Sequence, residues 1–428
     1  MLTLTDLPLP DHLHATVVRS ASYPVLPSAS LLIGQGITQL GGRGLAEMAR
    51  PGMRVVIAFT DATRYSPDRI LVEAILRVLD GAGVDRSAVT LLCATGLHRP
   101  MTPEERVAKL GEEIAGSMTI VDHNALDPDG LVDLGEIDGV PVVVNRLCVE
   151  ADLLLAIGVV EPHQYAGYSG GAKTIVIGCG GEPTIQATHG AAMLDEPGTR
   201  LGAVAGNRFQ EFIRKGGEAV GLDYVVNVLL DDRGDVVAAA AGPPRAVHDY
   251  LIARGRGLCQ VEVGQRAHLA IAGVSPAKGA NLYQASRAAT YLALAERTPL
   301  LPGAPIILPA SIPEGAGAGT GERRFFEILA AAGSPASLLA ELRDRGFPAG
   351  AQRAYILAKV LIDHPVIVAG AEHPEVVTAC HMHAAPDLAA ALDLAGQMAR
   401  ERFGIESPAP LELLVVPNAL VTLPMLRA

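Results

Sequence analysis

The chain has 428 residues, of which 49% are hydrophobic and 19% charged, and its formal net charge at pH 7 is -12. One hydrophobic core rarely supports a chain of this length, so we expect two globular domains. The acidic balance leaves no basic stripe that would bind nucleic acid or an anionic membrane surface, and the expected partner is a small metabolite.

The cysteine pattern indicates the compartment. Five cysteines are scattered along the chain, and no two of them form a Cys-x-x-Cys pair. This pattern is typical of reduced thiols and argues against a disulfide framework or a structural zinc site. The first residues lack the basic and apolar segments of a signal peptide, and no apolar run is long enough to span a bilayer. The sequence therefore predicts a soluble, cytoplasmic protein without a membrane partner.

Short apolar runs alternate with amphipathic stretches through the first half, which predicts β-α units on a mainly parallel sheet. One helix is expected from Ser66 to just before Gly81, and a second from Thr102, which has the capping-box spacing to Glu105. Residues 225–242 are expected to form a hairpin, so the sheet is not purely parallel. The expected strands are 54–59, 88–94, 118–123 and 151–160.

A second series of elements begins after residues 258–266. Its expected strands and helices are 267–274, 280–296, 304–310, 323–332, 334–345, 351–363, 365–370 and 387–403. The predicted fold is α/β with two domains, each a mainly parallel sheet flanked by helices, comprising residues 1–262 and 263–409. The closing segment 410–428 is strand-like and can return to the first domain.

Ligands of open α/β sheets bind outside the carboxyl ends of the strands, so the loops after the predicted strands are the place to look for a site. Three such loops carry polar residues of interest: Asp61, Thr63 and Arg64; His98; and His163, Ser169, Gly170, Gly171 and Lys173, with His189 further on.

Each loop also has an interpretation without chemistry. Asp61 and Arg64 can be a loop ion pair, and each histidine can be an ordinary surface or core residue. The glycines before Lys173 can serve a tight turn only, because the segment lacks the spacing of a Walker loop or a dinucleotide-binding loop. Chance explains the combination of all three loops poorly.

The residue types favour acid-base and covalent chemistry. Two imidazoles can exchange protons on opposite faces of a substrate near neutral pH, as a racemase requires. A lysine can carry a covalent cofactor because its amine is a nucleophile. A third histidine can hold a metal.

The sequence resembles the lactate racemase family, which uses a nickel-pincer nucleotide. The resemblance covers essentially the whole chain and includes D-x-T-R, T-G-x-H-R, H-x-x-A-G-Y-S-G-G-x-K and a downstream N-L-Y-Q. It implies that Lys173 is the attachment lysine, that His189 is the nickel ligand, and that His98 and His163 are the acid-base pair. Asp61, Thr63, Ser169, Gly170 and Gly171 would lie at the cofactor, and Arg64, Gln284 and Arg287 at the substrate.

The resemblance also implies a mechanism and partners. The first domain would bind the cofactor, the second would contact the substrate, and the active site would lie in the cleft between them. The C2 hydride of a 2-hydroxy acid would pass reversibly to the cofactor. Cofactor-building and nickel-insertion enzymes are expected partners, and a homo-oligomer is possible.

Two departures from lactate racemase bear on the substrate. Arg287 stands where lactate racemase has a lysine, and the chain has no tryptophan to lie over a small substrate. Both favour another 2-hydroxy acid, and a sugar-acid 2-epimerase is one alternative. Others are a Schiff-base lysine enzyme, a nicotinamide-dependent dehydrogenase and a non-catalytic nickel-nucleotide carrier.

Overall fold

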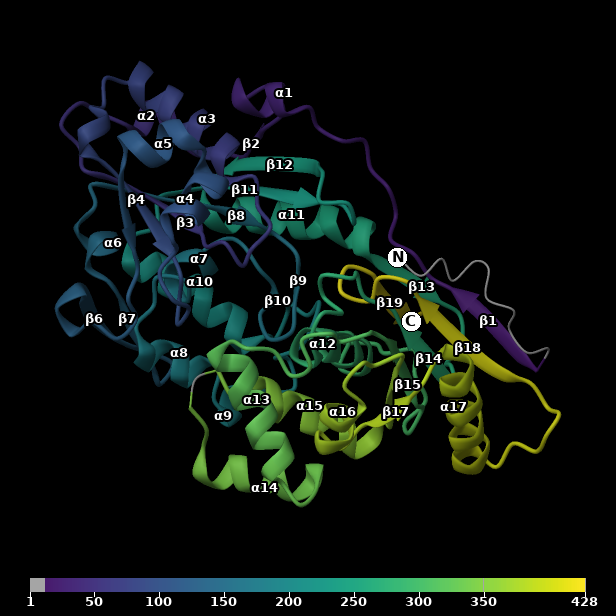
Figure 1. The fold of residues 1–428 in the computed structure, drawn as a ribbon. Coiled ribbons are helices and arrows are strands. Elements are labelled where there is room, and N and C mark those ends of the chain that lie inside the picture. Colours follow the sequence, from purple (N-terminus) through teal and green to yellow (C-terminus); the bar gives the residue numbers. More distant parts are fainter. Residues whose placement is uncertain (1–11, 349, 428) are drawn as a thin grey trace.

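The computed structural model describes residues 12–348 and 350–427, which form two large sheets flanked by helices (Figure 1). The first sheet has seven strands in the order β2-β12-β11-β8-β3-β4-β5. All neighbouring strands are parallel except β11 and β12, which form the predicted hairpin. The strands are β2 (Thr38–Gln39), β3 (Val55–Thr60), β4 (Val89–Ala94), β5 (Thr119–Asp122), β8 (Leu153–Val159), β11 (Tyr224–Leu230) and β12 (Val236–Gly242).

Helices cover both faces of the first sheet, because side chains alternate along each buried strand. Val55 and Ile57 pack into a cluster with α3, whereas Val56 and Ala58 join a second cluster with α7, α10 and α11. The helices of this half are α1 (Ser28–Leu32), α2 (Leu45–Met48), α3 (Asp68–Gly81), α4 (Pro103–Leu110), α5 (Glu112–Ser117), α6 (Arg146–Glu150), α7 (Lys173–Val176), α8 (Glu182–Thr188), α9 (Ala191–Leu194), α10 (Arg208–Val220) and α11 (Pro244–Cys259).

Local sequence signals explain the ends of two helices. The predicted capping box at the start of α4 is present, with Thr102 and Glu105 bonding each other's backbone. Helix α3 begins two residues later than expected, because Ser66 and Pro67 precede its first turn and the Ser66 hydroxyl bonds Asp68. It also includes Gly81, and the chain turns at Gly83, whose φ is 77°.

The second sheet has six parallel strands in the order β1-β18-β14-β15-β16-β17. Helix α17 packs on one face, and α12 and α15 lie on the other. The elements are β1 (Leu13–Val17), β14 (Leu269–Ala272), β15 (Ile306–Pro309), β16 (Val366–Ala369), β17 (His383–Ala385), β18 (Leu411–Val416), α12 (Leu282–Ala293), α13 (Thr320–Ala331), α14 (Pro335–Arg345), α15 (Gln352–Asp363), α16 (Pro374–Ala379) and α17 (Leu388–Phe403). The α/β fold class with mainly parallel sheets is thus confirmed.

The chain ends differ from the predicted division at residue 262. Strand β1, within the segment assigned to the first domain, pairs with β18 at the edge of the second sheet. Strand β18, in the closing segment 410–428, lies in the second sheet between β1 and β14. Its apolar residues are buried on both faces, as an interior strand requires. The last strand, β19 (Leu423–Leu426), pairs with β13 (Gln260–Val263) in a separate ribbon.

Two small hairpins were not predicted. β6 (Leu131–Ile137) pairs with β7 (Val140–Asn145), and β9 (Pro162–His163) pairs with β10 (Gly167–Tyr168). The second hairpin directly follows β8 and carries a candidate catalytic histidine.

One continuous apolar cluster joins the two halves. It contains the inner faces of both sheets together with α7, α10, α12 and α15. Within the described residues, no single helix is long and apolar enough to cross a membrane, although the bent pair 321–331 and 335–345 passes that test together.

Candidate active site

Asp61 and His98 follow two neighbouring parallel strands, β3 and β4, and therefore meet at one edge of the sheet. Oδ2 of Asp61 lies 2.6 Å from Nδ1 of His98. The Thr63 backbone N–H and hydroxyl both donate to Oδ1 of Asp61. Burial acts to raise the pKa of Asp61, but the hydrogen bond and charge of His98, the Thr63 hydroxyl and the charge of Arg64 outweigh it, and the pKa is lowered. The resulting carboxylate orients His98 with its proton on Nδ1 and its Nε2 free to accept a proton.

His163 lies on the β9-β10 hairpin after β8, and its surroundings differ from those of His98. Its Nδ1 accepts hydrogen bonds from the backbone N–H groups of Tyr165 and Ala166, at 3.3 and 3.2 Å. The neutral ring therefore carries its proton on Nε2. Burial lowers the pKa of His163 well below its usual value, and the charges of Lys173 and Arg64 lower it further.

His189 follows helix α8 and is buried, with 8% of its surface exposed. Its Nδ1–H donates to the Ile185 carbonyl oxygen at 3.0 Å, which leaves Nε2 free. Tyr165 and Phe209 contact the ring edge-on, with centroid distances of 5.7 and 5.2 Å. Burial and the charge of Lys173 lower the pKa of His189 to about 4, so the ring is neutral at physiological pH.

These properties are those of a histidine that can bind a metal: a neutral ring, one nitrogen fixed by a carbonyl and the other available. Among residues 12–348 and 350–427, no three His, Cys, Asp or Glu side chains gather in a way that could hold a metal ion.

Lys173 begins helix α7, directly after a turn that requires glycine. Gly170 and Gly171 have φ values of 81° and 56°, which residues with a side chain rarely adopt. A Cβ atom on Gly170 would lie 2.6 Å from the Val160 side chain. Burial lowers the pKa of Lys173 to about 8, and the charge of Arg64 acts in the same direction. The amine is thus more nucleophilic at neutral pH than an ordinary lysine.

Ser169 already has partners for its hydroxyl. Its Oγ donates to the Val159 carbonyl oxygen at 2.8 Å and accepts from the Glu161 N–H at 3.1 Å. These bonds hold the glycine turn against the end of β8. On the other side, Asn227 accepts a hydrogen bond from the Gly171 N–H at 2.8 Å.

Gln284 and Arg287 lie one turn apart on α12 of the second half. Arg287 Nη1 lies 3.4 Å from Gln284 Oε1, and its Nη2 donates to the Tyr291 hydroxyl at 2.8 Å. The Nε of Arg287 is buried and has no hydrogen-bond partner among the residues that the structure describes. Arg287 also contributes to the lowered pKa of His163, which places its guanidinium within electrostatic reach of that ring.

Contacts from the β9-β10 hairpin to α12 bring the two halves together at this point. Gln164 Nε2 donates to the Thr290 hydroxyl at 2.7 Å, and the Tyr291 hydroxyl lies 3.5 Å from the Pro162 carbonyl oxygen. The charges of four side chains lower the pKa of His163, which indicates that they lie near it: Lys173, Arg64, His189 and Arg287. The charge of Arg64 also acts on Asp61, so the Asp61–His98 pair lies beside this group.

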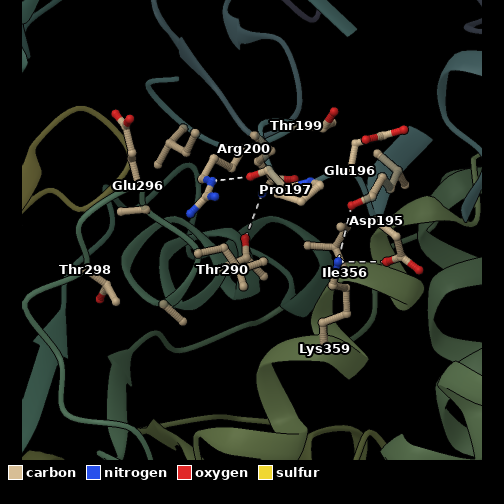
Figure 2. Close-up of a pocket in the computed structure, with 16 residues that line it drawn as sticks. Asp195, Glu196, Pro197, Thr199, Arg200, Thr290, Glu296, Thr298, Ile356 and Lys359 are labelled. Carbon is tan, nitrogen blue, oxygen red and sulfur yellow. Dashed lines mark hydrogen bonds and ion pairs between the residues drawn. The ribbon is translucent and has the colours of Figure 1, made fainter. Parts of the chain in front are cut away.

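A cavity of about 370 Å³ lies behind the β9-β10 hairpin, between the loop after α9 and helices α12 and α15. Figure 2 shows Asp195 beside Lys359 at its α15 side. One residue that lines the cavity, Gln164, directly follows the candidate catalytic residue His163 in the sequence. None of the predicted site residues lines the cavity. This cavity is distinct from the candidate site.

Several residues near the site were not predicted from the sequence. Tyr165 lies between His163 and His189 and contacts both rings. Tyr283, Lys278 and Arg353 approach from the second half. Tyr165 stands inside the motif that carries His163, so its position was a usable signal, whereas Arg353 is distant in sequence and only the fold brings it close.

This fold and this set of side chains define a class: a two-domain α/β enzyme with two differently oriented histidines, a nucleophilic lysine and a histidine suited to a metal. Comparisons with known proteins specify the family. The family described as Lactate racemase N-terminal domain matches residues 3–202, and the Lactate racemase C-terminal domain matches residues 272–417.

Relatives agree with these matches. The chain is 30% identical to the lactate racemase of Lactiplantibacillus plantarum over 89% of this chain and 87% of the relative. It is 29% identical to that of Thermoanaerobacterium thermosaccharolyticum over 90% and 91% of the two chains. The solved apoprotein of lactate racemase from T. thermosaccharolyticum superposes with a TM-score of 0.85 and 26% identity, covering 99% of this chain and 97% of that chain. A Thermotoga maritima protein at 17% identity, with a TM-score of 0.68 and coverage of 95% and 100%, shares the fold.

The chain belongs to the lactate racemase family, and it is accordingly an isomerase.

Proposed function

We propose that this enzyme inverts C2 of a 2-hydroxy acid, with a nickel-pincer nucleotide attached to Lys173 and the active site between the two halves. The observation that carries the proposal is the orientation of the three histidines. His98 offers a free Nε2 supported by Asp61, His163 offers an Nε2–H, and His189 offers a neutral nitrogen to a metal.

The residues present fit this cofactor. The amine of Lys173, with its pKa near 8, supports attachment to an electrophilic carbon, and His189 supports nickel binding. When bound, the nickel-pincer nucleotide supplies a reversible acceptor for the C2 hydride.

The chain's own residues then move the hydroxyl proton. His98 takes this proton through Nε2 while Asp61 stabilises the imidazolium that forms. Arg64 and Arg287 bind the substrate carboxylate and polarise the forming carbonyl. His163 returns a proton from the opposite face: it enters this step as the imidazolium, which requires the contacts of its Nδ1 with the Tyr165 and Ala166 N–H groups to open, and it leaves as the neutral ring. Proton exchange with solvent then restores both histidines. Attachment removes the charge of Lys173 and the substrate adds a carboxylate, and both changes raise the pKa of His163 from its low value in the free protein.

The partners follow from the cofactor. They would be the enzymes that build the nucleotide and insert nickel, in the cytoplasm where the five buried, free cysteines stay reduced.

A substrate panel tests the function. Cofactor-loaded protein is incubated with enantiopure 2-hydroxy acids and aldonic acids, and inversion at C2 is followed by chiral chromatography. We expect at least one acid to approach an equilibrium mixture from either direction. Loaded protein that inverts none of them would contradict the proposal.

A further inference from the structure

The N-terminal half of helix α12 gathers cations. The guanidinium of Arg353 lies over the ring of Tyr283 at 4.2 Å from its centroid, and its Nη1 donates to the Tyr283 carbonyl oxygen at 3.0 Å. One turn further along the helix, Arg287 lies over Tyr291 at 5.4 Å. Lys278 precedes the helix by a few residues and is affected by the charges of Arg287, Arg64 and Arg353. Tyrosines thus fix the two guanidinium groups near one amine.

The charge of Glu161 acts on Lys278 and Arg287, but it forms no ion pair with either of them among the described residues. In the parts of the chain that the structure describes, Lys278, Arg287 and Arg353 form no ion pair with Asp or Glu. The nearby Glu314 accepts instead from the Asn281 amide at 2.9 Å. Burial lowers the pKa of Lys278, and the neighbouring positive charges lower it further, against the charge of the exposed Glu161.

The same side chains face the reacting groups. Arg287, Arg353, Tyr283 and Tyr291 all influence the pKa of Tyr165, whose ring contacts His163 at a centroid distance of 5.5 Å. Within the described parts of the chain, the buried Nε of Arg287 has no hydrogen-bond partner. Arg287 bonds the Tyr291 hydroxyl, which contacts Pro162, the residue before His163, and Arg353 lies over Tyr283. The cations therefore lie close to His163, where the substrate is proposed to bind.

We propose that Lys278 and Arg353 form a second anion subsite, and that the substrate is a 2-hydroxy acid with a second carboxylate. This inference rests on the proposed function. Arg64 and Arg287 would hold the carboxylate next to C2, and the second carboxylate would reach the start of α12, where the helix dipole adds positive potential. A monocarboxylate would leave Lys278 and Arg353 uncompensated and half-buried.

Turnover with matched substrates tests the subsite. Loaded enzyme should invert malate with a kcat/KM about 10- to 100-fold above that for lactate, the range of one or two charged hydrogen bonds. Arg353→Gln and Lys278→Gln should each lose about 10-fold or more on malate and less than about 3-fold on lactate. The control is Arg345→Gln, because Arg345 is exposed on α14 and pairs with Glu341. Equal loss on both substrates would overturn the subsite.

Binding and cofactor retention separate the remaining interpretations. The apoprotein should be stabilised against heat by succinate more than by propionate, and Arg353→Gln should abolish the difference.

Intact mass and nickel content of both variants should match the parent. Loss of the cofactor would mean that these cations bind its phosphate, which overturns the subsite. Selective succinate binding without inversion of any acid would support the anion subsite and contradict racemisation. Inversion of lactate and malate with equal efficiency would support racemisation and overturn the subsite.

Discussion

Because its pKa is low, we expect the amine of Lys173 to react faster with electrophiles than the other lysine amines. At pH 8 about half of its amine is neutral, whereas an ordinary lysine with a pKa near 10.4 is almost fully protonated. A limiting amount of an amine-reactive ester should modify Lys173 of the apoprotein first, with a rate that rises with pH and is half-maximal near pH 8. Peptide mass spectrometry measures this rate. Arg64→Gln removes a nearby positive charge and should move the midpoint upward, and a midpoint near 10 in the parent would contradict the prediction.

The role proposed for His189 predicts that the nickel content of the protein depends on this residue. His189→Ala removes the free Nε2 and should lose most of the nickel while the mass of the organic adduct on Lys173 persists. Metal analysis and intact mass of the same preparation measure both quantities. His123→Asn is a suitable control, because His123 is also buried but bonds the Gly180 carbonyl oxygen and Asn145. Nickel retained at the parental level in His189→Ala would exclude the role.

The two acid-base histidines make a third prediction. His98→Ala and His163→Ala should each slow inversion in both directions by about 10²-fold or more, because each direction uses one residue as base and the other as acid. Initial rates from each enantiomer measure this effect. His163→Gln retains an N–H donor but cannot exchange a proton, so near-normal turnover of that variant would show that His163 serves only as a hydrogen-bond donor.

At the scale of elements, Asp195 joins the two halves. Its Oδ2 accepts from Arg343 Nε at 2.8 Å and from the Tyr355 hydroxyl at 2.7 Å, and its Oδ1 accepts from Lys359 Nζ at 2.9 Å. Burial acts to raise the pKa of Asp195, but these bonds outweigh it and lower the pKa to about 2. The cluster ties the end of α9 to α14 and α15.

Because the folded-state pKa of Asp195 is depressed, its stabilising effect is present above its unfolded pKa near 3.9 and is lost as pH falls towards 2. Asp195→Asn should lower the free energy of unfolding by about 1–2 kcal/mol at pH 7 and by little near pH 2. Denaturant titration at several pH values measures this. Glu341→Gln removes an exposed ion pair on α14 and should change it little. An equal effect of Asp195→Asn at both pH values would show that its charge is not involved.

The elements that the sequence predicted well are those with a local signal. The capping box of α4, the β11-β12 hairpin and helix α12 with Gln284 and Arg287 on one face all agree with the structure. The β9-β10 hairpin was missed because each strand has two residues, too few for any periodicity. Asp61 and His98 were correctly placed in loops after predicted strands, but their pairing was not predicted. The contact of Arg353 with Tyr283 depends on how α15 packs against α12.

At the scale of the whole molecule, sheet membership was the hardest property to predict. Strands β1 and β18 are short apolar segments near opposite ends of the chain. Neither segment carries a sequence signal that identifies the strand with which it pairs. Composition and the alternation of apolar runs with amphipathic stretches predicted two α/β halves. Which strands belong to each half depends on the topology of the folded chain, which these patterns do not encode.

The position of β1 beside β18 has a consequence for synthesis (Figure 1). Strand β1 is synthesised almost 400 residues before its partner β18, and β14 also remains unpaired on one side until β18 has been made. The first sheet, complete by β12, can form earlier. The second half is therefore assembled late and through contacts distant in sequence, which makes it the slower half to fold and the one that exposes unpaired strand edges to aggregation meanwhile.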